Sequence, residues 1–298
     1  MDTQIIPATI SKAIQLVTDG LTSEHSKRAY GKALQDFLVW MQANEKQFVK
    51  ASIQEYRQTL TGSPATINLR MSAIRKLAVE AADNGLLDGT IANGVRNVKG
   101  VAAHGVRTGN WLTKKQAQAL LLLPDITTLK GLRDRAILAV MLGGGLRRSE
   151  VAQMTYNHIR QLDGRWVIAD LVGKGNHVRT VPIPSWVKVA VDEWTEQANI
   201  ADGILFRAMH KGGYVAGDSM TPQAIRDLVN GYGKELGVEL AAHDLRRTFA
   251  KLAHKGGSGV DQIQLSLGHQ SMKTTEKYLG ASQNLSDAPA DHLGISLG

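Results

Sequence analysis

Side chains that suit phosphate chemistry gather in one stretch of this chain, residues 242–280. His243 and Arg246 are three residues apart and would share one face of a helix. His269 follows a Leu-Gly turn, and Tyr278 lies nine residues further along. Arginine binds phosphate oxygens with a planar fork, histidine transfers protons near neutral pH, and tyrosine can act as an oxygen nucleophile. The stretch therefore predicts a site that holds a phosphate and attacks it.

The composition is that of a globular protein with an excess of positive charge. The 298 residues are 43% hydrophobic and 21% charged, which argues against disorder and leaves room for two domains. Lys and Arg outnumber Asp and Glu by 35 to 27, and the net charge is positive on both sides of residue 100. Such a spread is expected of two domains that both touch nucleic acid, although solubility alone also explains it.

The chain contains no cysteine, which excludes disulfides and thiolate metal sites. Its longest apolar run, residues 136–146, is broken by three glycines and is far shorter than the roughly 20 residues of a membrane span. The first residues lack the basic start of a secretory signal. We therefore expect a cytoplasmic protein with no membrane partner and no metal.

Residues 1–98 are predicted to form an all-helical domain. Ser23 is placed to cap one helix, and Ser63 followed by Pro64 opens a longer helix that ends before Gly85. Shorter helices are expected near 10–17, 49–60 and 91–98. Three basic residues lie off the apolar stripe of the longest helix and are candidates for phosphate contact or for a solvated face: Arg70, Arg75 and Lys76.

A linker is predicted over residues 99–111, and a second domain over residues 112–283. Within it, two strand-like runs, 166–168 and 178–183, flank a Gly-Lys-Gly-Asn turn of the kind that joins a hairpin. The rest of this domain reads as helices that begin near Thr113, Gly131, Ser185 and Thr221. The expected fold class is mainly α, with a small antiparallel β-sheet.

Five motifs of the chain occur in the order and spacing of the tyrosine recombinases, the phage integrase family. Each motif alone is found in many proteins, but five in order that end in a tyrosine are hard to obtain by chance. The chain resembles this family from about residue 10 to 283, which implies a helical, SAM-like core-binding domain and a mixed α/β catalytic domain. The motifs are Leu146-Arg147-Arg148-Ser149-Glu150-Val151, Gly173-Lys174-Gly175, His243-Asp244-Leu245-Arg246, Leu267-Gly268-His269 and Tyr278.

The resemblance implies a site-specific recombinase with a type IB mechanism. Tyr278 would attack a scissile DNA phosphate and give a 3′-phosphotyrosyl link and a free 5′-hydroxyl, which later attacks to rejoin the strands. No cofactor is needed, because the covalent link preserves the energy of the broken bond. Arg147 and Arg246 would hold the non-bridging oxygens, and Lys174 would protonate the leaving 5′-oxygen. His243 would act as base or proton relay, and His269 would donate a hydrogen bond to the phosphate.

The supporting residues have alternatives that the sequence leaves open. Glu150, three residues after Arg147, would support the site as the acidic position of the family does. Arg148 competes with Arg147 for the clamp, and Lys174 would lie in an exposed turn whether or not it is catalytic. Two further basic residues of the hairpin are expected to contact backbone phosphates or solvent: His177 and Arg179.

Double-stranded DNA with a specific core site is the expected partner, in a homo-tetramer on DNA. Residues 284–298 form a tail that, as in the family, would dock on a neighbouring protomer. A type IB topoisomerase would share the residues but act without a defined site, and the separate helical domain argues against it. An inactive DNA-binding regulator would be expected to lack one of the catalytic groups. The sequence does not give the target site, or whether the reaction is integration, excision or resolution.

Overall fold

The computed structural model describes residues 7–102, 110–173 and 177–279. The chain divides into two compact units, residues 1–106 and residues 107–298, which we call the N-terminal and the C-terminal unit. No helix in the described ranges is both long and apolar enough to cross a membrane. The expected residue bounds of the domains remain predictions, as does the role of the tail at residues 284–298, which lies outside the described residues.

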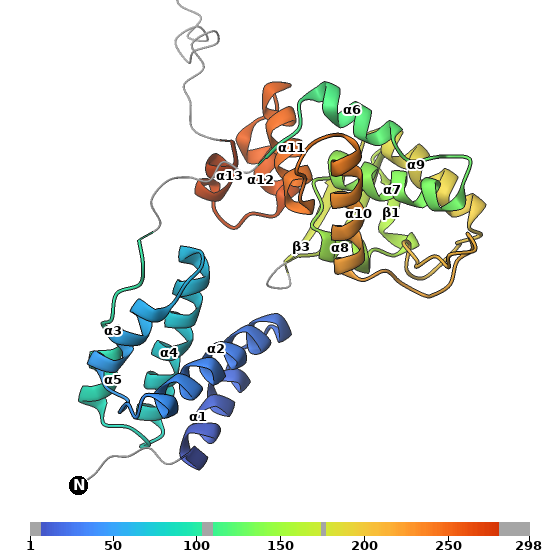
Figure 1. The fold of residues 1–298 in the computed structure, drawn as a ribbon. Coiled ribbons are helices and arrows are strands. Elements are labelled where there is room, and N and C mark those ends of the chain that lie inside the picture. The colour runs from blue at the N-terminus through green and yellow to red at the C-terminus, as the bar shows by residue number, and fades with distance from the viewer. Residues whose placement is uncertain (1–6, 103–109, 174–176, 280–298) are drawn as a thin grey trace, which may run out of the picture. The chain divides into compact units, whose positions relative to one another are not determined.

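The N-terminal unit is helical throughout its described part (Figure 1). Ser23 and Ser63 cap two of its helices as predicted, each accepting a hydrogen bond from a backbone N–H three residues further along. Large apolar side chains such as Phe37, Met71 and Ile74 are fully buried between the helices and form the core. The helices are α1 (Pro7–Asp19), α2 (Glu24–Ala43), α3 (Lys50–Thr59), α4 (Pro64–Asp83) and α5 (Gly89–Arg96).

The three basic residues singled out on α4 are engaged within their own unit. Arg70 pairs with Asp36 of α2, with Nη2 3.2 Å from Oδ2. Arg75 donates from Nε and Nη2 to the carbonyl oxygen of Val98, at 2.9 and 2.6 Å. Lys76 pairs with a glutamate one turn further along the helix, at 3.2 Å. The Arg70 and Arg75 contacts join α4 to other segments of the unit, the Lys76 pair lies within α4, and phosphate contact by the three residues stays a prediction.

Both ends of the predicted linker, residues 99–111, are attached to their adjoining units. The side chain of Asn68 donates to the carbonyl of Val101 and accepts from its N–H, at 2.9 and 2.8 Å. At the other end, the side chain of Asn110 donates to the carbonyl oxygen of Glu239 in the C-terminal unit, at 2.8 Å.

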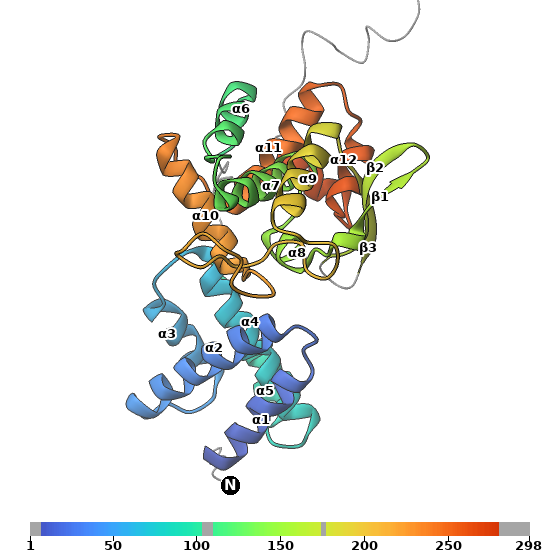
Figure 2. The same ribbon diagram turned by 90° about the vertical axis from the view of Figure 1, so that its right-hand side faces the viewer.

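A three-stranded antiparallel sheet lies in the C-terminal unit, with strand order β1-β2-β3 (Figure 2). The strands are β1 (Ile159–Leu162), β2 (Arg165–Val172) and β3 (Val178–Pro182). The hairpin of β2 and β3 confirms the predicted one, and its pairing is interrupted between Ile168 and Leu171. The sequence did not predict β1, a four-residue strand whose side chains are mostly exposed and so lack an apolar alternation.

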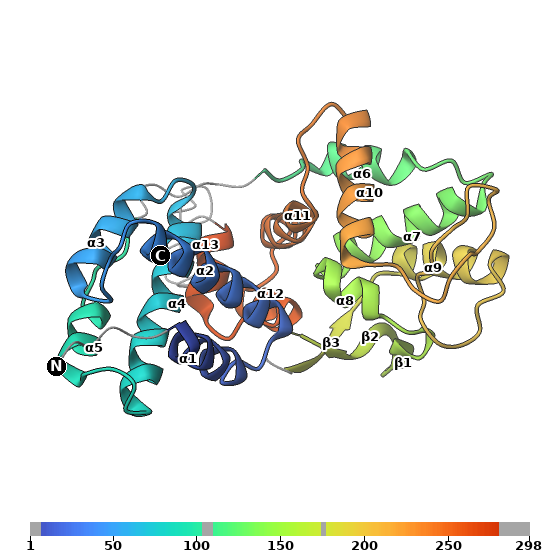
Figure 3. The ribbon, with the colours of Figure 1, turned by 60° about the horizontal axis from the view of Figure 1, so that its bottom comes forward.

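Eight α-helices account for most of the other described residues of the C-terminal unit. Its central helix is α7, in which residues 136–141 are all buried, and α7 lies side by side with α9 (Figure 3). Three helices near the end of the chain, α11, α12 and α13, pack against one another (Figure 1). The helices are α6 (Lys114–Leu122), α7 (Leu129–Gly143), α8 (Arg148–Gln153), α9 (Ser185–Gln197), α10 (Pro222–Glu235), α11 (Ala242–Lys255), α12 (Val260–Leu267) and α13 (Met272–Leu279).

Candidate active site

The turn that follows α7 places Arg147 at the start of α8. Gly145 in this turn has a φ of +62°, and a Cβ there would lie 2.6 Å from the ring of Phe249. Only glycine meets both conditions without strain. Arg147 is half-buried at the N-cap of α8, whereas Arg148 is exposed. The structure therefore favours Arg147 over its neighbour as the residue that faces the site.

Arg246 of α11 is fully buried and joins two turns of the site. Its Nη1 donates to the carbonyl oxygen of Gly145 at 2.7 Å, and its Nη2 donates to the carbonyl oxygen of Leu267. These carbonyls lie at the C-terminal ends of α7 and α12, where the partial negative charge of a helix stabilises a cation. The guanidinium thus links the turn before Arg147 to the turn before His269.

Glu150 is 3% exposed and holds two arginines at once. Its Oε2 accepts from the backbone N–H of Arg147 at 2.7 Å, and its Oε1 accepts from Nη1 of that residue at 2.8 Å. Arg179 donates to both oxygens, each at 2.9 Å. Burial alone would raise the pKa of Glu150, but the hydrogen bonds and charges of Arg179 and Arg147 hold it below the ordinary value. The carboxylate is therefore ionised.

Arg179 has other partners than the backbone phosphates that the sequence suggested. Its side chain is only 8% exposed, with both Nη atoms on Glu150 and Nε donating to the carbonyl oxygen of Ser266 at 2.9 Å. It also covers Gly268, where an added Cβ would lie 2.9 Å from Cδ of Arg179. A charged pattern in sequence does not separate a buried arginine from an exposed one, and we assign Arg179 no phosphate contact.

His269 follows Gly268, which ends α12 in the left-handed conformation. Its Nδ1 lies 2.9 Å from Oγ1 of Thr275, a fully buried residue of α13. Burial, followed by the positive charges of Arg246 and Arg147, lowers the pKa of His269 to about 4. Sequence reasoning missed Thr275, although its place three residues before the predicted nucleophile on one helix is a signal that the two share a face.

His243 lies in the first turn of α11. Taken over all its atoms, the residue is exposed to solvent. Partial burial of its ring, followed by the charges of Arg247, Arg246 and Arg147, lowers its pKa to about 4. Arg147 and Arg246 act on both predicted histidines, so the four side chains share one site. In the free protein both imidazoles are therefore neutral near pH 7.

Two predicted catalytic residues fall partly or wholly outside the described parts of the chain. Lys174 is not described, but Gly173 before it lies beside the Glu150 carboxylate, with an added Cβ 3.5 Å from Oε1. Tyr278 lies in α13, which packs against α11 and α12, and its side chain is not described. His177, beyond the hairpin turn, is exposed and its Nε2 lies 2.6 Å from Nε2 of Gln270.

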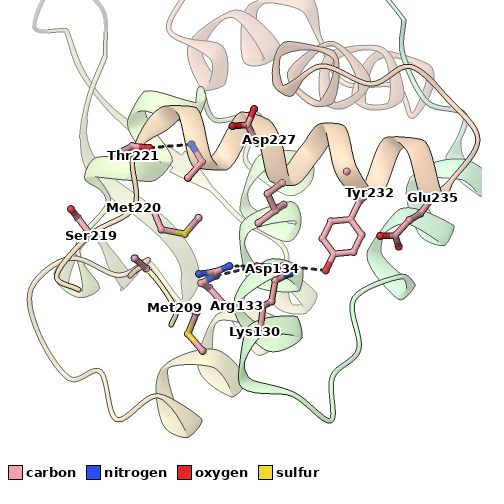
Figure 4. Close-up of a pocket in the computed structure, with 14 residues that line it drawn as sticks. Lys130, Arg133, Asp134, Met209, Ser219, Met220, Thr221, Asp227, Tyr232 and Glu235 are labelled. Atoms are coloured by element: carbon pink, nitrogen blue, oxygen red, sulfur yellow. Dashed lines mark hydrogen bonds and ion pairs between the residues drawn. The ribbon is translucent and has the colours of Figure 1, made fainter. Parts of the chain in front are cut away.

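A second ionic cluster lines a pocket of about 530 Å³ between α7, α10 and the segment before α10 (Figure 4). Asp134 is fully buried there and accepts hydrogen bonds from Arg133 at 2.7 and 3.0 Å. Lys130 and the hydroxyl of Tyr232 donate to its other oxygen at 2.5 and 3.1 Å. Of the predicted site residues whose side chains the structure describes, none lines this pocket.

Comparison with known protein families decides what the arginine and histidine site belongs to. Residues 110–284 match the Phage integrase family, and residues 14–85 match the Phage integrase, N-terminal SAM-like domain. The chain belongs to the phage integrase family. It is therefore a tyrosine recombinase, an enzyme that cuts and rejoins DNA strands at specific sites, as the resemblance predicted.

Individual relatives and solved structures agree with this assignment. The XerC tyrosine recombinase of Myxococcus xanthus is 28% identical over 270 residues, which span 86% of this chain and 87% of the relative. A tyrosine recombinase of Synechococcus elongatus is 25% identical over 318 residues, with 99% and 96% covered.

Two solved structures show the same fold as the recombinase. The XerH recombinase bound to a palindromic difH substrate has a TM-score of 0.70 at 18% identity, with 94% of this chain and 82% of that chain covered. A lambda integrase dimer bound to a core site has a TM-score of 0.68 at 14% identity, with 92% and 78% covered. The predicted fold class, mainly helical with a small antiparallel sheet, is confirmed.

Proposed function

We propose that the recombinase cleaves DNA with Tyr278 as the nucleophile. The phenolic oxygen forms a bond to the scissile phosphorus while the bond to the 5′-oxygen breaks, which leaves a 3′-phosphotyrosyl link. The observation that carries this proposal is the convergence of Arg147, Arg246, His243 and His269 on one site next to α13. The free 5′-hydroxyl of a partner strand then attacks the link and restores a phosphodiester and the tyrosine.

Arg147 and Arg246 bind the non-bridging oxygens of the phosphate in this proposal. The pentavalent transition state concentrates negative charge there, and guanidinium donors fixed in advance stabilise it without reorganisation. Arg246 is fixed by the carbonyls of Gly145 and Leu267, and Arg147 is fixed by Glu150, the supporting residue. Both are therefore oriented before DNA arrives.

The two protons of the cleavage step have separate routes. His243, neutral at pH 7 because its pKa lies near 4, can accept the proton that Tyr278 loses. The leaving 5′-oxygen takes a proton from Lys174, the residue that follows Gly173 in the sequence. The rejoining step is the reverse of cleavage: His243 returns its proton to the tyrosine oxygen, and Lys174 takes back a proton from the attacking 5′-hydroxyl, so the enzyme is regenerated.

His269 donates a hydrogen bond to the same phosphate. Its Nδ1 lies against Thr275 Oγ1, and with that hydroxyl as donor the ring proton sits on Nε2. Nε2–H is then the group that we propose donates to a phosphate oxygen. Because Thr275 and Tyr278 both lie in α13, the contact also ties the helix of the nucleophile to the phosphate-binding histidine.

The proposed substrate is double-stranded DNA with a defined core site. The N-terminal and C-terminal units of each protomer bind it, and four protomers form a homo-tetramer on the DNA in the cytoplasm. The tail at residues 284–298 is proposed to dock on a neighbouring protomer, because it carries four apolar side chains directly after the predicted nucleophile: Leu285, Leu293, Ile295 and Leu297. Deleting the tail should weaken the pairing of two DNA sites and spare binding to one. Normal tetramers of the truncated protein on DNA would contradict this role.

The experiment that tests the proposed function uses nicked duplexes from the DNA that flanks the native gene. A nick beside the cleavage point lets the short leaving strand diffuse away, so the covalent complex accumulates. Wild type is expected to give a protein–DNA band that survives SDS, and Tyr278→Phe is expected to give none. Sequencing the trapped DNA identifies the site. A band from both proteins would mean that another residue attacks.

A further inference from the structure

Arg179 contacts three residues of the site: Glu150, Ser266 and Gly268. Its two Nη atoms lie on the two oxygens of Glu150, and its Nε lies on the carbonyl oxygen of Ser266, all at 2.9 Å. Its Cδ covers Gly268. A guanidinium group whose three nitrogens all donate to fixed acceptors has one orientation. The Glu150 carboxylate and the Ser266 carbonyl are therefore also held in one orientation.

We propose that Arg179 is a positioning residue for DNA cleavage, which acts through Glu150 on Arg147 and through Ser266 on His269. Each Glu150 oxygen accepts one hydrogen bond from Arg179 and one from Arg147. Arg179 thereby fixes the plane of the carboxylate, and that plane sets the direction of the Arg147 fork. This inference rests on the proposed function of Arg147 as a phosphate clamp.

The charges of Glu150, Arg147 and Arg179 support different roles for the two arginines. One carboxylate faces two guanidinium groups, so one positive charge remains for a ligand. The Arg179 side chain is 8% exposed and that of Arg147 is 26% exposed. The surplus charge therefore meets solvent, and an incoming phosphate, at Arg147. Arg179 neutralises Glu150 from the protein side.

The second link of Arg179 runs to the loop that carries His269. The carbonyl oxygens of the last turn of a helix lack partners within the helix. At the end of α12, Arg179 takes the carbonyl of Ser266 and Arg246 takes that of Leu267. Two arginines thus cap the helix that ends at Gly268, immediately before His269. Loss of Arg179 removes one of these caps and two of the four hydrogen bonds that Glu150 accepts.

The test compares single-turnover cleavage of the trapped site by wild type and by Arg179→Gln. On the ordinary phosphodiester we expect cleavage to slow ~10²-fold, the order found when a catalytic group is displaced by about 1 Å, with DNA affinity unchanged. The matched control is Arg160→Gln. It removes an exposed ion pair between an arginine and Asp170 in the same sheet. The control is expected to cleave at the wild-type rate.

Two modified DNAs separate positioning from general structural support. A methylphosphonate at the cleavage point lacks the charge that Arg147 neutralises, so the defect of Arg179→Gln should shrink to less than about 10-fold, as should that of Arg147→Ala. A 5′-bridging phosphorothiolate supplies a leaving thiolate that needs no proton, and the defect should persist on it. Recovery on the phosphorothiolate instead would mean that Arg179 acts through Lys174, which overturns the stated route.

A double variant provides a further check. If Arg179 acts on Arg147 through Glu150, then adding Arg179→Gln to Glu150→Gln should slow cleavage much less than Arg179→Gln slows the wild type, because the carboxylate that Arg179 orients is already gone. The double variant also leaves no unpaired buried carboxylate and replaces the single variant if that one fails to fold.

The outcomes separate this inference from the proposed function. Wild-type cleavage by Arg179→Gln, or an equal defect on all three DNAs together with weaker DNA binding, would overturn the positioning role. A wild type that forms no covalent complex would instead contradict the proposed function itself.

Discussion

Two buried carboxylates of the C-terminal unit, Asp134 and Glu150, are built alike and serve different ends. Each is at most 3% exposed and each binds two cationic side chains. Around Asp134 the third partner is the Tyr232 hydroxyl, which joins α10 to α7 (Figure 4). Around Glu150 the remaining hydrogen bond comes from the backbone N–H of Arg147. The two clusters differ in whether the arginine bound to the carboxylate is open to solvent: the Arg133 side chain is 7% exposed and that of Arg147 is 26% exposed.

The partners of Asp134 serve the fold. Burial, followed by the Asp134 charge, raises the pKa of Tyr232, so its hydroxyl stays protonated and donates to that carboxylate. Near Glu150, by contrast, Arg147 is partly exposed and two histidines have their pKa lowered to about 4. A buried ion pair alone therefore does not mark a functional site. An arginine that keeps an open side, next to histidines with a lowered pKa, marks a candidate for one.

Removing the charge at Asp134 is the strongest way to separate the two clusters. Asp134→Asn leaves Arg133 buried without its counter-charge, and breaking such a pair costs about 3–5 kcal/mol of unfolding free energy. Urea unfolding followed by tryptophan fluorescence measures this, because four of the five tryptophans lie in the C-terminal unit. Cleavage per folded molecule should match wild type. A slower cleavage step in the folded fraction would contradict the structural role of this cluster.

Arg147→Ala is the corresponding change at the Glu150 cluster. Loss of a fixed donor to the transition-state oxyanion slows cleavage by about 10²–10³-fold, as measured by single-turnover formation of the covalent complex. The control is Arg148→Ala, the exposed neighbour, which should retain cleavage. Equal defects in both variants would mean that the clamp was assigned to the wrong arginine or is shared between the two.

Local signals explain why much of the fold was predictable. Ser23 and Ser63 act within three residues of their own positions, and a cap or a Gly-rich hairpin turn reports its own structure. The order of the motifs likewise predicted site roles for Arg147, His243, Arg246 and His269, and the structure brings these four residues near one another. The boundaries of helices were predicted to within a few residues for the same reason.

Contacts between distant segments were not predictable. Arg179 meets Ser266 across 87 residues, and no pattern near Arg179 indicates that its fork is buried. Thr275 was overlooked because a buried hydroxyl that serves a histidine looks like any polar helix residue in sequence. The strand β1 was missed because mostly exposed positions give no periodic signal. Each failure concerns burial, which depends on the whole fold.

Tyr232→Phe tests the Asp134 cluster more gently. The change removes one hydrogen bond to a buried carboxylate and keeps the ring, so we expect the unfolding free energy to fall by about 2 kcal/mol. Tyr214→Phe, at an exposed tyrosine whose ring stacks on His210, is the matched control and should change little. Urea unfolding of both variants gives the comparison. Equal stability of Tyr232→Phe and wild type would mean that Arg133 and Lys130 alone satisfy Asp134.

Acidification should weaken the fold through the two histidines near Glu150, His243 and His269. In the unfolded chain His243 and His269 take up protons below their ordinary pKa of 6.5, whereas in the folded protein they stay neutral down to about 4. The unfolded state then binds more protons, so the unfolding free energy falls as the pH falls through this window. Because both side chains are partly open to solvent, we expect a loss of about 1 kcal/mol between pH 6.5 and 5.

Replacing both histidines shows whether they cause this loss. His243→Asn with His269→Asn should flatten the dependence of unfolding free energy on pH between 6.5 and 5, as measured by urea unfolding at fixed ionic strength. Glu150 does not interfere, because its pKa lies below the ordinary 4.5 and it stays ionised across this range. Tyr232→Phe should shift the curve without changing its slope, because its partner Asp134 lies in the other cluster. An unchanged slope in the double variant would place the acid sensitivity elsewhere in the molecule.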